Sequence, residues 1–299
     1  MRTYVASLAF VALLAACAGS RPFAVTPPGS SVDASASRPQ TISTKDLFVV
    51  FQYGSTGFAL ILQNGTFKYV GEINGLGLPY GSWVDSHGLY IASYSRYPDI
   101  VEFSSPSKAP FSYTAHVSYP LAVTTDSSGN VYETDNSGWI NEYAQRKDAT
   151  KKRCAVTYPV GVAVDGAGHV FVTLDSTGAS QIVEFTDFST CSSQTLGVKL
   201  RRGEEMALDK SDNIIVCDAD ARTVDIIKPP YKSVSGHLGS GFKGPVDVTI
   251  NSANNRVWIV DATAKIVYDL YYPSGKLVAK LAFTAGTPIS AVDGSNYVP

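Results

Sequence analysis

The chain has 299 residues, of which 44% are hydrophobic and 17% are charged, so it carries enough apolar side chains for a folded core. Its formal net charge at pH 7 is −2 and it has no long run of one sign, which excludes the basic footprint of a nucleic-acid-binding protein. The 17 tyrosines and 25 glycines favour an all-β fold with frequent turns.

The first residues predict export. Arg2 precedes an apolar run, residues 4–16, that is too short to cross a bilayer comfortably and is typical of a signal peptide. The run ends in Leu14-Ala15-Ala16-Cys17, which resembles the lipobox of bacterial lipoproteins. That resemblance implies removal of residues 1–16 and lipidation of Cys17. An ordinary secretory signal with a chance cysteine is the alternative.

Residues 17–45 are rich in Ser, Pro and Ala and have no apolar period, which predicts a flexible tether with an r.m.s. span of roughly 30 Å. Ala18, rather than Asp, follows the cysteine. This resembles the sorting signal for the outer membrane of Gram-negative bacteria, so we expect an exported protein that is lipid-anchored there.

From residue 46 onward the sequence repeats itself. A turn residue recurs at Asp85, Asp126, Asp165, Asp209 and Asn251, with spacings of 41, 39, 44 and 42 residues. Each copy contains a short strand, a tight turn, a second strand, a third strand and a more polar fourth strand. A period near 40 residues with four strands per unit predicts the blades of a β-propeller.

The two ends of the repeat predict how the ring closes. The strands expected at 47–51, 58–62 and 67–73 lack a first strand, whereas the segment PISAVD at 288–293 is a first strand with no blade after it. We therefore expect residues 290–293 to pair with residues 48–51, which removes an open sheet edge. The prediction is an all-β domain, residues 46–299, with six blades of four antiparallel strands.

The best copy, PVGVAVDGAGHVFVT at 159–173, resembles the NHL repeat of six-bladed propellers. That family contains lyases, lactonases, other hydrolases and binding proteins, so the resemblance implies the fold and leaves the activity open.

Catalytic motifs give little support for an enzyme. The sequence has no nucleophile elbow, phosphate-binding loop or paired-cysteine metal motif. His87 and His169 fall in turns, and His116 and His237 fall on outer strands, so we interpret all four as surface histidines. This argues against chemistry like that of virginiamycin B lyase, which draws on histidines at the mouth of the ring.

Acidic residues are the remaining candidates. The second position of the repeat holds Gly81, Ala122, Gly161, Glu205 and Asp247, so two carboxylates occupy equivalent places in adjacent blades. Gluconolactonase-like propellers bind a divalent metal with Glu, Asn and Asp at this mouth. The pair therefore predicts a calcium or magnesium site, because hard cations prefer oxygen ligands. The alternative is that both side chains point into solvent.

Four further acids follow the second strands: Asp135, Asp175, Asp218 and Asp261. We interpret them as turn residues that bond their own backbone, with metal ligation as the alternative. Among the remaining cysteines, Cys154 and Cys191 are expected to form a disulfide, and Cys217 is expected to be a buried apolar side chain.

The functional prediction is a binding or scaffold module outside the cytoplasm. We expect membrane contact through the lipid, an unidentified protein or small-molecule partner, no nucleic acid, a monomer, and no cofactor apart from the possible calcium or magnesium. The alternative is a metal-dependent, lactonase-like hydrolase or lyase with its site at the channel mouth.

Overall fold

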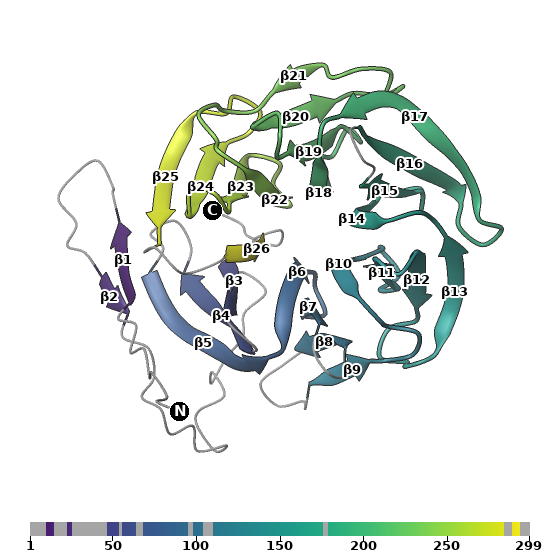
Figure 1. The fold of residues 1–299 in the computed structure, drawn as a ribbon, viewed down its shortest axis with the longest axis horizontal. Coiled ribbons are helices and arrows are strands. Elements are labelled where there is room, and N and C mark those ends of the chain that lie inside the picture. The colour runs from purple at the N-terminus through teal and green to yellow at the C-terminus, as the bar shows by residue number, and fades with distance from the viewer. Residues whose placement is uncertain are drawn as a thin grey trace, which may run out of the picture.

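The computed structural model describes residues 10–14, 23–25, 47–53, 56–63, 68–94, 98–103, 110–175, 179–283 and 289–293. These residues form a β-propeller, in which antiparallel sheets stand around a central axis (Figure 1). Among them, no helix is long and apolar enough to span a membrane. The predicted lipidation site, Cys17, and most of the predicted tether lie outside the described residues.

Five of the sheets that the described residues form have four strands each. The first contains β26 (Ile289–Asp293), β3 (Leu47–Tyr53), β4 (Thr56–Gln63) and β5 (Lys68–Leu76). The second contains β6 (Leu78–Val84), β7 (Leu89–Tyr94), β8 (Asp99–Phe103) and β9 (Phe111–Tyr113). The third contains β10 (Pro120–Thr125), β11 (Val131–Asp135), β12 (Trp139–Tyr143) and β13 (Thr150–Ala155). The fourth contains β14 (Pro159–Val164), β15 (Val170–Leu174), β16 (Ser180–Asp187) and β17 (Ser192–Leu200). The fifth contains β18 (Gly203–Leu208), β19 (Ile214–Asp218), β20 (Thr223–Ile227) and the short β21 (Gly236–His237).

The remaining sheet departs from the prediction. Its strands β22 (Pro245–Ile250), β23 (Arg256–Asp261), β24 (Ile266–Tyr271) and β25 (Leu277–Ala282) are extended by β1 (Phe10–Leu14) and β2 (Phe23–Val25). β1 pairs with β25 through Leu13↔Ala282 and Leu14↔Leu281. The expectation of six blades with four strands each is therefore wrong in this respect: five of the sheets among the described residues have four strands, and this one has six.

Ring closure follows the prediction from the chain ends. β26 pairs antiparallel with β3, with Val292 opposite Val49 and Asp293 opposite Phe48. The last described strand thus becomes the innermost strand of the sheet that contains the first residues of the repeat. Figure 1 shows β26 next to β3, close to the axis. The closure is confirmed, and its reason is that an unpaired first strand would leave backbone donors and acceptors without partners.

The recurring acidic residue fixes the turn between the first and second strands. The carboxylate of Asp126 accepts the backbone N–H groups of Ser128 and Asn130, both at 2.9 Å. Asp209 accepts the N–H groups of Ser211 and Asn213 in the same way, at 2.8 and 2.9 Å. A carboxylate that bonds the backbone two and four residues on stabilises a tight turn, which explains why the repeat carries Asp or Asn there.

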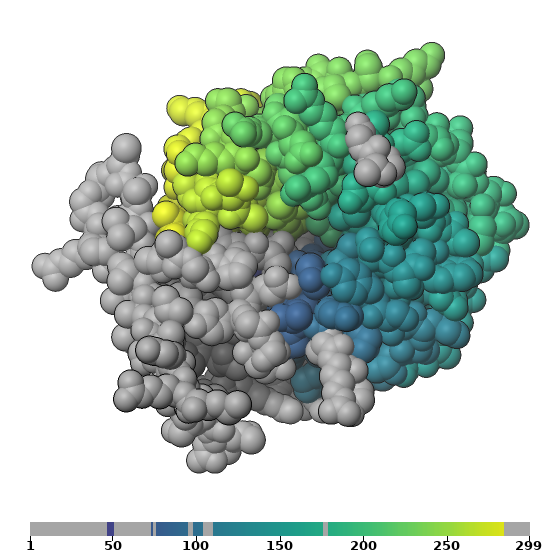
Figure 2. Space-filling model, viewed as in Figure 1, coloured from purple at the N-terminus to yellow at the C-terminus, as the bar shows by residue number. Residues whose placement is uncertain are grey.

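The apolar core lies between the sheets rather than within a single layer. Ala207, Ile215 and Val224 of one sheet pack with Val248, Val257 and Tyr268 of the next. Other core clusters join neighbouring sheets in the same manner, for example Tyr90 and Ile100 with Val131 and Tyr143. Successive blades consequently press against one another around the ring, as the space-filling view shows for the coloured part of the chain (Figure 2).

Candidate functional site

One end of the ring is irregular in every innermost strand. We call the end where the innermost strands begin and the second strands end the mouth face. The register shifts there lie between the following pairs: Pro79/Ser82, Pro120/Ala122, Pro159/Val162, Gly203/Met206, Pro245/Asp247 and Ile289/Ala291. Bulges re-aim side chains at the rims of ring-shaped sheets and are common beside binding sites. The bulges therefore make the mouth face the best candidate for a binding site.

Small residues bring neighbouring innermost strands close together on one side of the mouth. A Cβ atom on Gly81 would lie 2.5 Å from the carbonyl oxygen of Leu121, and one on Gly161 would lie 2.7 Å from the carbonyl oxygen of Glu204. Both distances are shorter than a Cβ contact allows, so glycine is required for this backbone approach. Ala122, at the equivalent position between them, is fully buried.

Glu205 lies on the other side of this ring and reaches back toward Gly161. Its Oε2 is 2.8 Å from the position that a Cβ atom on Gly161 would take. The backbone N–H of Met206 donates to Oε2 at 3.3 Å, and the backbone N–H of Val162 also bonds the carboxylate. The side chain thus crosses from β18 to β14 and is half-buried.

Asp247 completes the pair from β22 and is only 6% exposed. Burial and the negative charge of Asp247 raise the pKa of Glu205 well above its ordinary value, while the backbone N–H bonds oppose the shift. The structure brings together the two acids that the repeat alignment placed in equivalent positions. The alternative that both side chains point into solvent is wrong, because Asp247 is buried and Glu205 lies against Gly161 of the neighbouring blade.

Two threonines of the second strands tie the bulges of adjacent blades together. Thr134 Oγ1 accepts the N–H of Ala122 at 3.0 Å and donates to the carbonyl oxygen of Val160 at 2.6 Å. Thr173 Oγ1 accepts the N–H of Gly161 at 2.7 Å and donates to the carbonyl oxygen of Glu204 at 2.8 Å. We did not predict this bridge, although the shared position of the threonines in VYETD and VFVTL is a signal for it.

Cys217 occupies the same place in the next second strand, opposite the bulge that contains Glu205. Its side chain is fully buried, as predicted. Burial and the nearby charges of Asp247, Glu204 and Glu205 raise the pKa of its thiol well above the ordinary value. The thiol therefore stays protonated and is a poor nucleophile.

Three of the acids after the second strands are held by the backbone. Asp135 accepts the N–H groups of Ser118 at 2.6 Å, Tyr119 at 3.2 Å and Ser137 at 2.9 Å. Asp218 and Asp261 each accept the N–H groups of two residues before the innermost strand and one in the following turn. All three carboxylates are buried, so they serve the turn role rather than metal ligation.

Asp175 does not belong to this set. Leu174 takes the equivalent position at the end of β15, and the backbone N–H of Asp175 donates to the carbonyl oxygen of Tyr158 at 2.9 Å. In the neighbouring blades the same backbone bond is made by Asn136 and Ala219, which directly follow the acids Asp135 and Asp218. Asp175 follows the second strand as predicted, and its side chain is exposed.

The histidines lie away from Glu205 and Asp247. His87 and His169 contact Asp85 and Asp165 in the turns at the opposite end of the ring, at 3.2 and 2.8 Å. His116 lies in the turn after β9 rather than on an outer strand as predicted, and it contacts Thr150 at 2.7 Å. His237, in the outer strand β21, contacts Asp225 at 2.8 Å. Each histidine has a local partner, which agrees with the surface interpretation.

Tyrosines line a second part of the mouth face. Tyr80 in β6, Tyr94 at the end of β7, Tyr119 before β10 and Tyr158 before β14 form what we call the tyrosine arc. The rings of Tyr94 and Tyr119 meet edge to face at 4.5 Å between centroids, and the hydroxyl groups of Tyr80 and Tyr119 are 3.3 Å apart. That hydrogen bond and burial raise the pKa of Tyr119 to about 12.

The tyrosine arc was missed at the sequence level, because its rings come from separate blades. The repeated Tyr-Pro pairs Tyr119-Pro120 and Tyr158-Pro159 are a signal that could have shown it. Pro120 and Pro159 begin β10 and β14, and the tyrosine before each of them is held at the mouth.

Among the described residues, Glu205 and Asp247 are the acidic side chains at the mouth that a metal ion could share. Within the described part of the chain, no group of three or more His, Cys, Asp or Glu side chains is placed to hold a metal ion. A cation between Glu205 and Asp247 would therefore need further oxygen ligands from backbone carbonyl groups or from a bound ligand.

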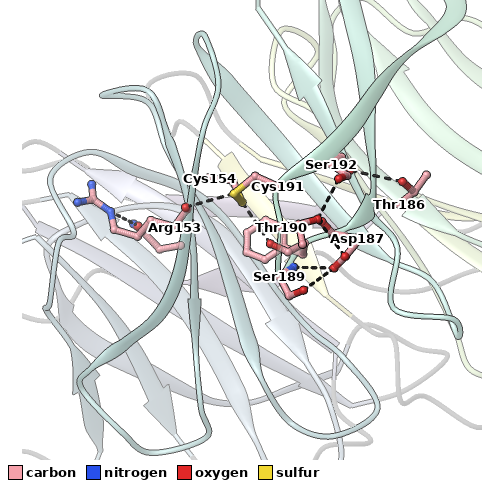
Figure 3. The surroundings of a disulfide bond; sticks show 10 residues. Arg153, Cys154, Thr186, Asp187, Ser189, Thr190, Cys191 and Ser192 are labelled. Atoms are coloured by element: carbon pink, nitrogen blue, oxygen red, sulfur yellow. Dashed lines mark hydrogen bonds between the residues drawn. A yellow bond between two sulfur atoms is a disulfide. The ribbon is translucent and has the colours of Figure 1, made fainter.

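A disulfide joins the two cysteines that were paired from the sequence. Cys154 in β13 and Cys191 in the turn between β16 and β17 have Cα atoms 5.6 Å apart (Figure 3). The Asp187 carboxylate holds this turn by accepting hydrogen bonds from the N–H and hydroxyl of Ser189 and from the hydroxyl of Thr190. The cross-link connects adjacent blades and lies away from Glu205 and Asp247.

Comparisons with known proteins support the fold. A propeller chain in the structure of a nidogen/laminin complex superposes with a TM-score of 0.67 at 16% identity, over 83% of this chain and 99% of that one. A Bacteroides caccae protein of unknown function gives 0.61 at 12% identity, over 83% and 98%. Virginiamycin B lyase from Staphylococcus aureus gives 0.50 at 14% identity, over 71% and 73%. No family model and no curated protein sequence matches the chain.

Proposed function

We propose that this protein is an exported, lipid-anchored propeller that binds a ligand or partner at its mouth face. Lipid on Cys17 and the tether of residues 17–45 would hold the propeller close to the outer membrane. Cleavage before Cys17 would remove β1, so that β25 becomes the outer strand of its sheet. The similarity to a propeller in a nidogen/laminin complex is consistent with a binding role, although fold alone does not define function.

The observation that carries this proposal is the pairing of Glu205 with Asp247. Two buried or half-buried carboxylates on adjacent strands destabilise the folded protein unless a proton, a donor or a cation lies between them. Equivalent positions elsewhere in the ring hold Gly81, Ala122 and Gly161, which carry no charge and so cause no repulsion. Groups that are retained against stability, with perturbed pKa values, are typical of functional sites.

The same pair supports a second candidate, a calcium- or magnesium-dependent hydrolase or lyase of the lactonase kind. Glu205 and Asp247 supply oxygen ligands from two blades, and a bound cation could polarise a carbonyl group of the substrate. The other mouth acids do not add to this set, because Asp135, Asp218 and Asp261 are bonded to backbone N–H groups. This is why binding, rather than catalysis, is the first proposal.

Titration of calcium and magnesium chloride into the purified protein, followed by calorimetry, separates the two candidates. Glu205→Gln and Asp247→Asn test the pair, and Asp212→Asn, an exposed residue in the turn opposite the mouth, is the control. Metal-dependent hydrolysis of simple lactones that both mouth variants abolish would establish the enzyme and overturn the binding proposal. Absence of turnover, with cation or ligand binding that only the mouth variants weaken, would support it.

A further inference from the structure

We propose that the tyrosine arc binds a neutral oligosaccharide, an inference that rests on the proposed binding role of the mouth face and names its ligand class. The arc consists of Tyr80, Tyr94, Tyr119 and Tyr158 and follows the beginnings of three successive innermost strands, β6, β10 and β14. Because the rings come from three successive blades, a chain of several sugar units suits them better than one small molecule.

Tyr158 shows that an aromatic ring is presented to solvent by a fixed backbone. Its side chain is 59% exposed, although a large apolar ring is usually covered. Its φ is +49°, a conformation that side-chain-bearing residues rarely adopt, and its carbonyl oxygen accepts the N–H of Asp175 at 2.9 Å. Strained, pinned residues of this kind cluster at binding sites, where they hold a contact surface in place before the ligand arrives.

Three of the tyrosines contact one another, and Asn136 joins the backbone beside them to the backbone next to Tyr158. Tyr119 packs against Tyr94 and bonds the hydroxyl of Tyr80. Asn136 donates its backbone N–H to the carbonyl oxygen of Tyr119 at 2.9 Å and its Nδ2 to the carbonyl oxygen of Pro159 at 3.3 Å. Tyr80, Tyr94 and Tyr119 therefore form one cluster of rings, and Asn136 holds the start of the strand that follows Tyr158 next to it.

Sugar rings match the chemistry of this surface. A pyranose presents C–H groups on one face, which pack on an aromatic ring, and hydroxyl groups around its edge, which need both donors and acceptors. A phenol supplies the ring and a group that both donates and accepts. At neutral pH a tyrosine hydroxyl is protonated, so each of these groups keeps its donor.

The charge distribution favours an uncharged ligand. Ser118, Ser137 and Thr157 flank the arc with exposed hydroxyl side chains. Asp135, the charged group beneath them, is fully buried and accepts backbone N–H bonds. Asp175, the residue whose N–H bonds Tyr158, has an exposed carboxylate that would repel an anionic polymer. The exposed cations Arg201, Arg202 and Lys243 precede β18 and β22, in another sector of the mouth face, where a charged polymer would be drawn instead.

The test uses maltohexaose, cellohexaose and chitohexaose as probes, titrated into the purified protein in a calorimeter. We expect saturable binding of at least one of them, at least tenfold weaker in Tyr158→Ala and Tyr119→Ala. Tyr271→Ala is the control, because Tyr271 is 47% exposed on β24, outside the arc. Binding should survive about 0.5 M salt, since an uncharged ligand gains nothing from screened charges.

Failure to bind any of the three sugars would overturn this inference. So would sugar binding that Tyr271→Ala weakens as much as Tyr158→Ala does. If calcium or a protein ligand binds in a manner that depends on Glu205 and Asp247 while all three sugars fail, the proposed binding role stands and only the ligand class is wrong. A protein partner that needs Tyr158 without any sugar binding has the same consequence.

Discussion

The carboxylate of Glu205 fills the space that Gly161 leaves empty, with Oε2 2.8 Å from the position of the missing Cβ atom. Glycine on one blade and glutamate on the next are therefore complementary. This contact places a carboxylate on the backbone of a neighbouring innermost strand and brings it within range of Asp247.

Gly161→Ala should destabilise the protein. The added methyl group would meet both the carbonyl oxygen of Glu204 and the Glu205 carboxylate below contact distance, and overpacking of this kind costs about 1–3 kcal/mol. Gly166→Ala is the matched control, since a Cβ atom there has no neighbour within 4 Å. Chemical denaturation should show a lower midpoint for the first variant only. Equal midpoints would mean that the innermost strands do not approach as described.

Glu205→Gln should change how stability depends on pH. Because the pKa of Glu205 is raised in the folded state, the folded protein binds this proton more tightly than the unfolded chain does. That stabilisation is complete below the ordinary carboxyl pKa and is lost as pH rises through the raised value. The variant lacks the titration, so its unfolding free energy relative to the native protein should increase from pH 4 to pH 8. A difference that is the same at every pH would contradict the raised pKa; Asp212→Asn is the control.

Removal of the disulfide by Cys154→Ser with Cys191→Ser should lower the unfolding free energy by about 2–4 kcal/mol, because the cross-link closes a 37-residue loop in the unfolded chain. The native protein under reducing conditions should show the same loss when melted. If reduction leaves the melting temperature unchanged, the two cysteines are not bonded in solution.

Cys17→Ser should abolish lipid attachment. The expectation rests on the Leu14-Ala15-Ala16-Cys17 box after an apolar run. Fractionation of the expressing bacterium should show the native protein in the membrane with the added mass of lipid, and the variant either unprocessed or soluble. An unchanged mass and unchanged fractionation would remove the anchor from the proposed function.

Much of the fold could be predicted, because a propeller repeats one short pattern. The spacing of Asp126, Asp165 and Asp209 predicted the sheets, and the surplus strand at residues 290–293 predicted the closure with β3. The addition of β1 and β2 to one sheet was not predictable, since residues 10–14 read as the apolar run of a signal peptide.

The site was harder to predict, for a physical reason. Equivalent positions in the repeat showed that Glu205 and Asp247 are neighbours, because adjacent blades place equivalent residues side by side. The tyrosine arc combines non-equivalent positions: Tyr80 is within a first strand, Tyr94 ends a second strand, and Tyr119 precedes a first strand. Whether such residues meet depends on the bulges in the innermost strands, which the sequence pattern does not show. The one-residue offset of Asp175 from the other three acids is likewise not visible in the repeat.

The central claim is that Glu205 and Asp247 form a mutually repulsive pair at the mouth, retained for binding rather than for stability. A double-mutant cycle on the unfolding free energy at pH 7, with Glu205→Gln, Asp247→Asn and the double variant, measures it most directly. We predict that the effects of the two changes are not additive, with a coupling of about 0.5–3 kcal/mol, because the charge of Asp247 acts on Glu205. Additive effects of the two changes would contradict the claim.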